Sequence, residues 1–128
     1  MVLCNTGCYD RDIIDSKPGV SLPTVTGLAY SMSDRTATVT WGIPSNIPSE
    51  IARPMRINVE VLQYRPGTYS PVRVHLVTLE DEATSTTYEV PSDGYEYHVI
   101  IKLVGNVKDP PYGTSNLIYS LGQTVIVK

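Results

Sequence analysis

Two cysteines near the N-terminus are the first residues in this chain whose type and spacing could do chemistry. Cys4 and Cys8 are separated by three residues. Two thiols are too few for a structural zinc site, and no histidine lies near them to complete one. The spacing is not C-x-x-C and the flanking residues do not favour a thiolate, so a reactive redox pair is not expected. We expect one of three states: a local disulfide formed in an oxidising compartment, the remnant of a preceding cysteine-rich module, or free thiols without a role.

Two histidines and one run of carboxylates are the next candidates. His75 and His98 each fall on the outward side of an expected strand, and neither has a second histidine or a cysteine at ligand spacing. Both are therefore expected to be solvated surface residues. Glu80, Asp81 and Glu82 are consecutive, and one short turn cannot supply the roughly six to eight oxygen ligands that a calcium ion takes. We interpret the run as a solvated turn that discourages pairing at a sheet edge, and we predict no metal site.

Motifs for catalysis and cofactor binding are missing from the sequence. It contains no G-x-S-x-G, no phosphate-binding loop, no H-E-x-x-H and no G-x-G-x-x-G. The formal net charge of -3 gives no electrostatic reason to bind nucleic acid. No run approaches the roughly eighteen apolar residues that a membrane helix requires. We therefore predict a protein that is not an enzyme, carries no cofactor, binds no nucleic acid and does not insert directly into a membrane.

Alternating apolar and polar residues indicate β-strands that bury one face. The clearest case is residues 95–104, where Tyr97, Val99 and Ile101 fall on one side of an extended chain and polar residues fall on the other. Such a strand has to press its apolar side against a second sheet. Trp41 ends another alternating stretch and is the best candidate for the largest core residue. We predict a two-layer β-sandwich with Trp41, Tyr97, Val99 and Ile101 in its core.

The turn signals divide the chain into an arm and one domain. A length of 128 residues suits a single core. Residues 1–19 have no sustained period and end in Pro-Gly, so we interpret them as an arm or as the tail of a preceding cysteine-containing module. Residues 20–128 form the expected sandwich, with no segment of helical period. Seven strands are predicted, over residues 22–30, 36–41, 56–65, 72–79, 84–90, 95–104 and 115–127, the last with a bulge at 121–123.

One predicted strand, residues 72–79, alternates less cleanly than the others. Val72, Val74 and Leu76 form an apolar face, which we expect to point toward the core, and the other face is mixed. This pattern suits the margin of a sheet.

Three motifs in order along the chain resemble those of the fibronectin type III family, and the resemblance covers roughly Pro23 to Val127. They are the opening Pro23-Thr24-Val25-Thr26-Gly27-Leu28, the tryptophan and proline of Thr38-Val39-Thr40-Trp41-Gly42-Ile43-Pro44, and the step Val90-Pro91 followed by Tyr97-His98-Val99-Ile100-Ile101. The resemblance implies a seven-stranded immunoglobulin-like sandwich. In that family the first tyrosine of the sixth strand forms a tyrosine corner, in which its hydroxyl bonds to the backbone of the preceding turn. The match assigns this role to Tyr97, with Tyr95 as the rival because the spacing from Val90 is one residue longer than usual.

The resemblance also implies where partners would bind. Strand order would bring three segments to one end of the sandwich: the loop after Trp41, the turn at 80–83 and the loop at 105–115. These segments would present Asn46, Ile47, Ile51, Arg53 and Tyr112 as a contact patch. The alternative is that the loops fold their apolar residues back over the end of the core.

The function that fits these expectations is a non-catalytic protein–protein interaction or spacer module of an extracellular adhesion protein or receptor ectodomain, located outside the cell or at its surface. The alternative is a structural β-sandwich of a phage tail, or an accessory domain of a microbial carbohydrate-active enzyme. The sequence identifies neither the protein partner nor the oligomeric state.

Overall fold

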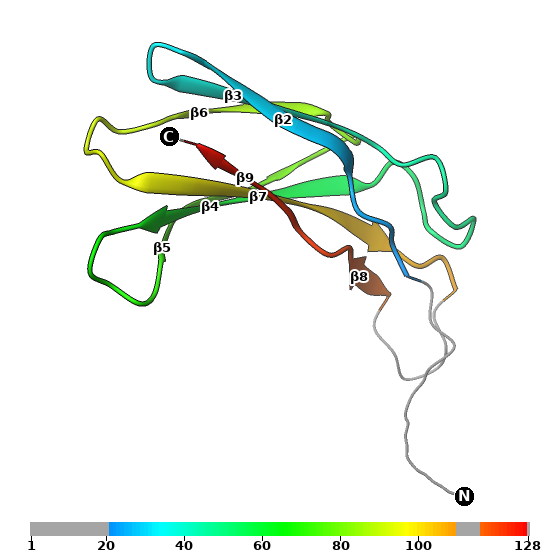
Figure 1. The fold of residues 1–128 in the computed structure, drawn as a ribbon. Helices are drawn as coiled ribbons and strands as arrows, with labels where there is room; N and C mark the ends of the chain where they lie inside the picture. Colours follow the sequence, from blue (N-terminus) through cyan, green and yellow to red (C-terminus); the bar gives the residue numbers. More distant parts are fainter. Residues whose placement is uncertain (1–20, 110–115, 128) are drawn as a thin grey trace, which may run out of the picture.

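The computed structural model describes residues 21–109 and 116–127, and every regular element among them is a β-strand. The described strands form two antiparallel sheets, which confirms the predicted all-β sandwich (Figure 1). None of the described residues belongs to a helix long and apolar enough to cross a membrane. The smaller sheet has the order β2 (Thr26–Ser33), β3 (Thr36–Gly42) and β6 (Ser85–Glu89). The larger sheet has the order β5 (Val72–Leu79), β4 (Arg56–Tyr64), β7 (Glu96–Asn106) and β8 (Leu117–Tyr119), with β9 (Gln123–Val127) also paired to β7.

Several predictions concern residues that lie outside the described part of the chain. These are the arm at residues 1–19, the cysteines Cys4 and Cys8 within it, and Tyr112. They stay predictions.

The core lies between the inner faces of β3, β4 and β7. All three strands alternate between buried and less buried residues, as their sequences predict. Burial of one large aliphatic or aromatic side chain contributes about 1.5–3 kcal/mol, so these rows supply most of the apolar stabilisation. The four residues predicted for the core, Trp41, Tyr97, Val99 and Ile101, are all buried in one hydrophobic cluster.

The predicted seventh strand is two strands in the structure, so the described residues contain eight strands and not seven. Residues 120–122 separate β8 from β9, and the first of them is Ser120. Its hydroxyl accepts a hydrogen bond from the backbone N–H of Leu103 at 2.8 Å, and its own N–H donates to the Leu103 carbonyl at 3.0 Å. Gly122 follows, where an added Cβ would come within 2.7 Å of the Ile100 side chain. Because Ser120 bonds to both backbone groups of Leu103, the gap between β8 and β9 leaves no backbone group of Leu103 unpaired. Gly122, which has no Cβ, lets the chain pass close to the Ile100 side chain.

The strand β5 faces the core with a different set of residues from the predicted one. Val77 and Leu79 pair with buried residues of β4 and pack against the core, and His75 lies on the same side. Val74 and Leu76 are exposed. The prediction that Val72, Val74 and Leu76 form the inner face is therefore wrong for Val74 and Leu76. The irregularity between His75 and Arg73 puts Val72 opposite the buried Gln63, on the inner side of the sheet, although Val72 itself is 46% exposed. A shift of one residue moves the side chains beyond it to the other face.

The two histidines also differ from their predicted surroundings. His75 is exposed, as expected, but it lies on the side of β5 that carries Val77 and Leu79, with its ring centre 5.5 Å from that of Tyr88, so only the expected outward face is wrong. His98 does point outward from β7, but it is only half exposed. Its ring lies 4.0 Å from that of Tyr64, and its Nε2 lies 3.2 Å from a carboxylate oxygen of Glu96.

Tyr97 occupies the place of the expected corner residue but bonds to a side chain. Its hydroxyl donates to the Asp93 carboxylate at 2.5 Å and accepts from the Gln63 amide at 2.8 Å. The other Asp93 oxygen accepts the backbone N–H of Tyr95 at 2.9 Å. The expected bond from hydroxyl to turn backbone is thus replaced by an aspartate that bridges the two. The hydroxyl's hydrogen bond holds the pKa of Asp93 below its usual value, while burial raises the pKa of Tyr97.

Candidate interaction surface at the loop end

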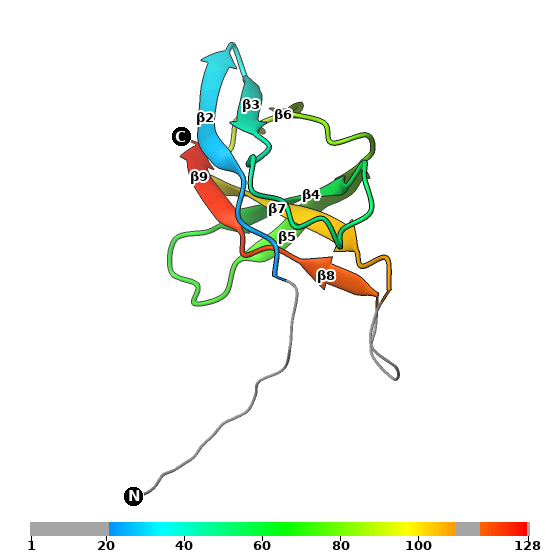
Figure 2. The same ribbon diagram turned by 90° about the vertical axis from the view of Figure 1, so that its right-hand side faces the viewer.

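Three segments meet at one end of the sandwich, as the strand order predicted. They are the loop from β3 to β4 (residues 43–55), the turn from β5 to β6 (80–84) and residues 107–109 after β7. Figure 2 views the molecule from this end and shows the β3–β4 loop crossing from the smaller sheet to the larger one. We call this region the loop end.

The β3–β4 loop is joined to the end of β7 by backbone hydrogen bonds. Ala52 donates to the Asn106 carbonyl at 2.8 Å, and Lys108 donates to the Glu50 carbonyl at 2.8 Å. Between these bonds, Ile51 forms an isolated β-bridge with Val107. The loop therefore behaves locally as an additional strand pair.

Ile51 is a core residue. Its exposed fraction is 1%, and it belongs to the main hydrophobic cluster. The expectation of an exposed Ile51 in a contact patch is wrong, because the β-bridge turns this side chain inward. Ile47 is half buried and also packs against the core. Ile47 and Ile51 therefore agree with the alternative expectation, in which the loop folds its apolar side chains back over the end of the core.

A second set of bonds joins the β3–β4 loop to the β5–β6 turn through Glu82. The carboxylate of Glu82 receives the Arg53 guanidinium through both oxygens, at 2.6 and 2.7 Å. It also accepts the Met55 backbone N–H at 2.8 Å, while the Glu82 N–H donates to the Met55 carbonyl at 2.9 Å. Bidentate pairs of this kind restrict geometry more than single bonds do. The Arg53 hydrogen bond is the main cause that holds the pKa of Glu82 below its usual value.

The same turn is fixed to β3 by the tryptophan. The indole N–H of Trp41 donates to the Ala83 carbonyl at 2.9 Å, and the Trp41 backbone N–H donates to the Thr84 carbonyl at 3.0 Å. Asp81 and Glu82 have φ angles of 57° and 51°, in the left-handed region that residues other than glycine seldom adopt. The surrounding bonds therefore hold the turn in a strained shape.

The residues that the loop end exposes are mostly polar. Asn46 and Arg53 are exposed as expected, but the guanidinium of Arg53 is already paired with Glu82. Sequence reasoning missed Glu82 as the residue that joins the loops, because it stands 29 positions from Arg53. The exposed set at this end comprises Ser45, Asn46, Ser49, Glu50, Arg53, Pro54, Glu80, Asp81, Thr84, Lys108 and Asp109.

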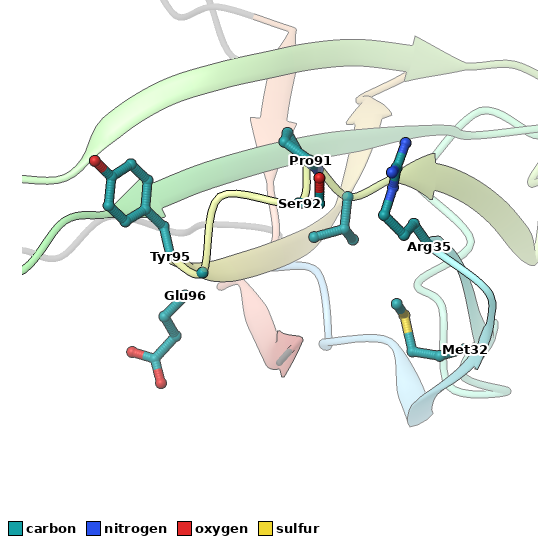
Figure 3. Close-up of a pocket in the computed structure, with 8 residues that line it drawn as sticks. Met32, Arg35, Pro91, Ser92, Tyr95 and Glu96 are labelled. Carbon is teal, nitrogen blue, oxygen red and sulfur yellow. The ribbon is translucent and has the colours of Figure 1, made fainter.

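The opposite end carries a shallow depression that the sequence did not predict. It has a volume of about 480 Å³ and lies between the β2–β3 hairpin and the segment that enters β7. Figure 3 shows Met32 and Arg35 on one side of it, and Tyr95 and Glu96 diverging on the other. Its lining contains no pair of nucleophile and base. No group of three metal-ligating side chains occurs among the residues described.

Comparison with known proteins places the chain in a family. No curated protein matches it. Among solved structures it is similar to a fibronectin type III domain of human collagen XX, with 18% identity and a TM-score of 0.44, over 88% of this chain and 100% of that chain. A family model with the description "Domain of unknown function (DUF4945)" matches residues 8–127, and the chain belongs to that family.

Proposed function

We propose that this chain is a fibronectin type III-like, non-catalytic module that binds a protein partner with its loop end. The observation that carries the proposal is the mutual fixation of three segments from distant parts of the sequence. Glu82 joins the β3–β4 loop to the β5–β6 turn, and the bridge between Ile51 and Val107 joins the same loop to the end of β7.

Fixed loops favour binding for a thermodynamic reason. A mobile loop loses conformational entropy when a partner orders it, whereas a loop that is already held loses little. At the loop end the apolar side chains Ile51 and Met55 are buried as anchors. The polar side chains above them stay accessible and are carried on a scaffold of strands, the usual arrangement for binding loops. The setting we propose is extracellular or at the cell surface, as the family resemblance implies.

The charges at this surface describe the partner it suits. Glu50, Glu80, Asp81 and Asp109 are exposed acids, and Lys108 is an exposed base in the same region. Mixed charge with an acidic excess suits a protein surface that carries lysine or arginine opposite it, because complementary charge steers association.

The test uses affinity capture with the full chain as bait. A loop-end variant, Asn46→Arg with Ser49→Arg, changes two exposed side chains that make none of the contacts described above. A matched control, Ser31→Arg with Ser70→Arg, adds the same charge on β2 and on the β4–β5 loop, away from the loop end. The proposal expects a protein from the source organism that is retained by the wild type and by the control but lost by the loop-end variant. Equal retention by all three baits would refute binding through this surface.

A further inference from the structure

The strand β5 forms one edge of the larger sheet and exposes an unusual amount of apolar surface. Among the described strands it pairs with β4 alone (Figure 1). Val72, Val74 and Leu76 are 46%, 40% and 50% exposed. Proteins usually protect such edges with prolines, short strands or several charges, because an open edge offers unpaired backbone groups to another chain. This edge strand has eight residues and contains no proline.

Part of β5 is regular enough to pair with a further strand. From His75 to Leu79 its register with β4 runs without a shift, and the irregularity lies beyond His75, toward Arg73. The centre of this regular stretch is Val77. An antiparallel strand of the same sequence, placed with Val77 opposite Val77, would set His75 opposite Leu79 and Leu76 opposite Thr78. Residues on the core side would then meet residues on the core side, as a continuous sheet requires.

The charges next to the strand favour the same arrangement. Arg73 precedes the regular stretch, is 57% exposed and makes only a long contact of 3.5 Å to Glu60. Glu80 and Asp81 follow the strand and are exposed. In an antiparallel pair the arginine of each copy lies near the two acids of the other, and the contact occurs twice by symmetry.

A parallel pair would instead place like charges side by side. The acidic turn therefore opposes parallel pairing but supports the antiparallel pair, whereas the interpretation from the sequence was that it discourages any pairing at a sheet edge. Glu82 does not contribute to the charge pairing between the two copies, because its carboxylate is already bonded to the Arg53 guanidinium.

We propose that a second copy of this chain pairs with the first along β5, antiparallel and centred on Val77. The two larger sheets become one continuous sheet. The contact uses the same surface on both copies, so it closes as a dimer and does not propagate into a fibre. Val74 and Leu76 lose contact with water in the dimer, and this supplies an apolar contribution alongside the backbone hydrogen bonds. The pairing uses Glu80 and Asp81 of the loop end and leaves the β3–β4 loop and residues 107–109 free, and the proposal does not rest on the proposed function.

The first test measures self-association of the full chain by sedimentation velocity over a wide concentration range. The wild type is expected to form dimers that weaken as salt is added, because the contacts between Arg73 and the acids are exposed. Leu76→Lys and Arg73→Glu should each raise the dissociation constant by roughly tenfold or more. Adding Glu80→Arg and Asp81→Arg to Arg73→Glu exchanges the charges and should restore dimer formation.

Ile126→Lys is the matched control. Ile126 is 44% exposed and lies on the outer face of the same sheet, on β9, away from the β5 edge. It should associate like the wild type. Circular dichroism of every variant checks that the fold is kept. A wild type that stays monomeric at all concentrations overturns the proposal, and so does equal weakening by Ile126→Lys and Leu76→Lys.

A second test examines the register directly. In a background with Cys4→Ser and Cys8→Ser, Val77→Cys places two thiols on the symmetry axis, at a separation that an antiparallel pair allows for a disulfide. Mild oxidation should yield a covalent dimer, while Ile126→Cys in the same background should not. Dimers that form with Ile126→Cys but not with Val77→Cys would show that another surface is used.

Discussion

At the scale of single residues, the Tyr97 hydroxyl shows how one polar group can be central to a buried network. It stands between the Gln63 amide and the Asp93 carboxylate, and Gln63 in turn accepts a hydrogen bond from the Arg65 guanidinium at 2.6 Å. Gln63 is one of the few polar residues buried in the described part of the chain. Its amide stays satisfied through Tyr97, and a buried polar group without a partner is costly.

We predict that Tyr97→Phe lowers the free energy of unfolding by about 1–3 kcal/mol, because the buried Gln63 amide keeps only a long hydrogen bond of 3.5 Å to Asp93, and Asp93 loses the hydroxyl as a donor. Tyr95→Phe is the control, since the Tyr95 ring is only half buried and contacts Arg65 through its face. This change should stay within about 0.5 kcal/mol of the wild type. Urea denaturation measures both. A larger loss for Tyr95→Phe would mean that Tyr95 is the corner residue instead.

The Glu82 carboxylate predicts how stability depends on pH. Its pKa is lowered in the folded protein, chiefly by the Arg53 hydrogen bonds. A group with a depressed pKa stabilises the fold above its unfolded pKa of about 4.3, and this contribution is lost as the pH falls through the lower folded value. The unfolding free energy of the wild type should therefore decrease below about pH 4. Glu82→Gln should show a shallower decrease, measured by urea denaturation at a series of pH values. Parallel curves for the two proteins would contradict the assignment.

At the scale of elements, the ranges of most strands could be predicted to within one or two residues, including the edge strands β5 and β6, but the start of β2 and the inner face of β5 could not. The alternation is strict in β4 and holds from Glu96 to Leu103 in β7, because both faces of each strand have fixed surroundings, and the predicted ranges differ from the observed ones by one or two residues. The first strand was predicted at 22–30 but runs from Thr26 to Ser33, although Leu22 and Val25 before it are buried in the core. In a sequence, a segment that is buried but not paired in a sheet has the same pattern of apolar residues as a strand. β5 is apolar on both faces, so periodicity alone could not choose which face is inside.

The register of β5 can be checked by comparing its two faces. Leu79→Ala should destabilise the fold by about 1–2 kcal/mol, less than for a fully buried leucine because Leu79 is only partly buried. Leu76→Ala, on the outer face, should cost less than about 0.5 kcal/mol at concentrations low enough to keep the chain monomeric. Thermal unfolding of both variants shows which face of β5 points toward the core. A larger loss of stability for Leu76→Ala than for Leu79→Ala would support the inner face expected from the sequence.

At the scale of the whole molecule, the sequence predicts which loops meet but not how they are joined. Strand order alone brings the β3–β4 loop to the β5–β6 turn and to the end of β7. The pairing of Arg53 with Glu82 depends on side-chain geometry between segments far apart in the chain, and no local pattern encodes it. The same holds for Ile51, whose inward position follows from its bridge to Val107. The segments that were expected to meet therefore do meet in the described residues, while Ile47 and Ile51 pack inward against the core.

The indole of Trp41 has a consequence for how this protein can be observed. It is the only tryptophan in the chain, it is buried, and its N–H is bonded to Ala83 in the turn that belongs to the loop end. Its ultraviolet emission therefore comes from one known position. Any event that loosens or tightens that turn should shift the emission wavelength, so an unlabelled sample carries its own optical reporter of the surface proposed to meet a partner.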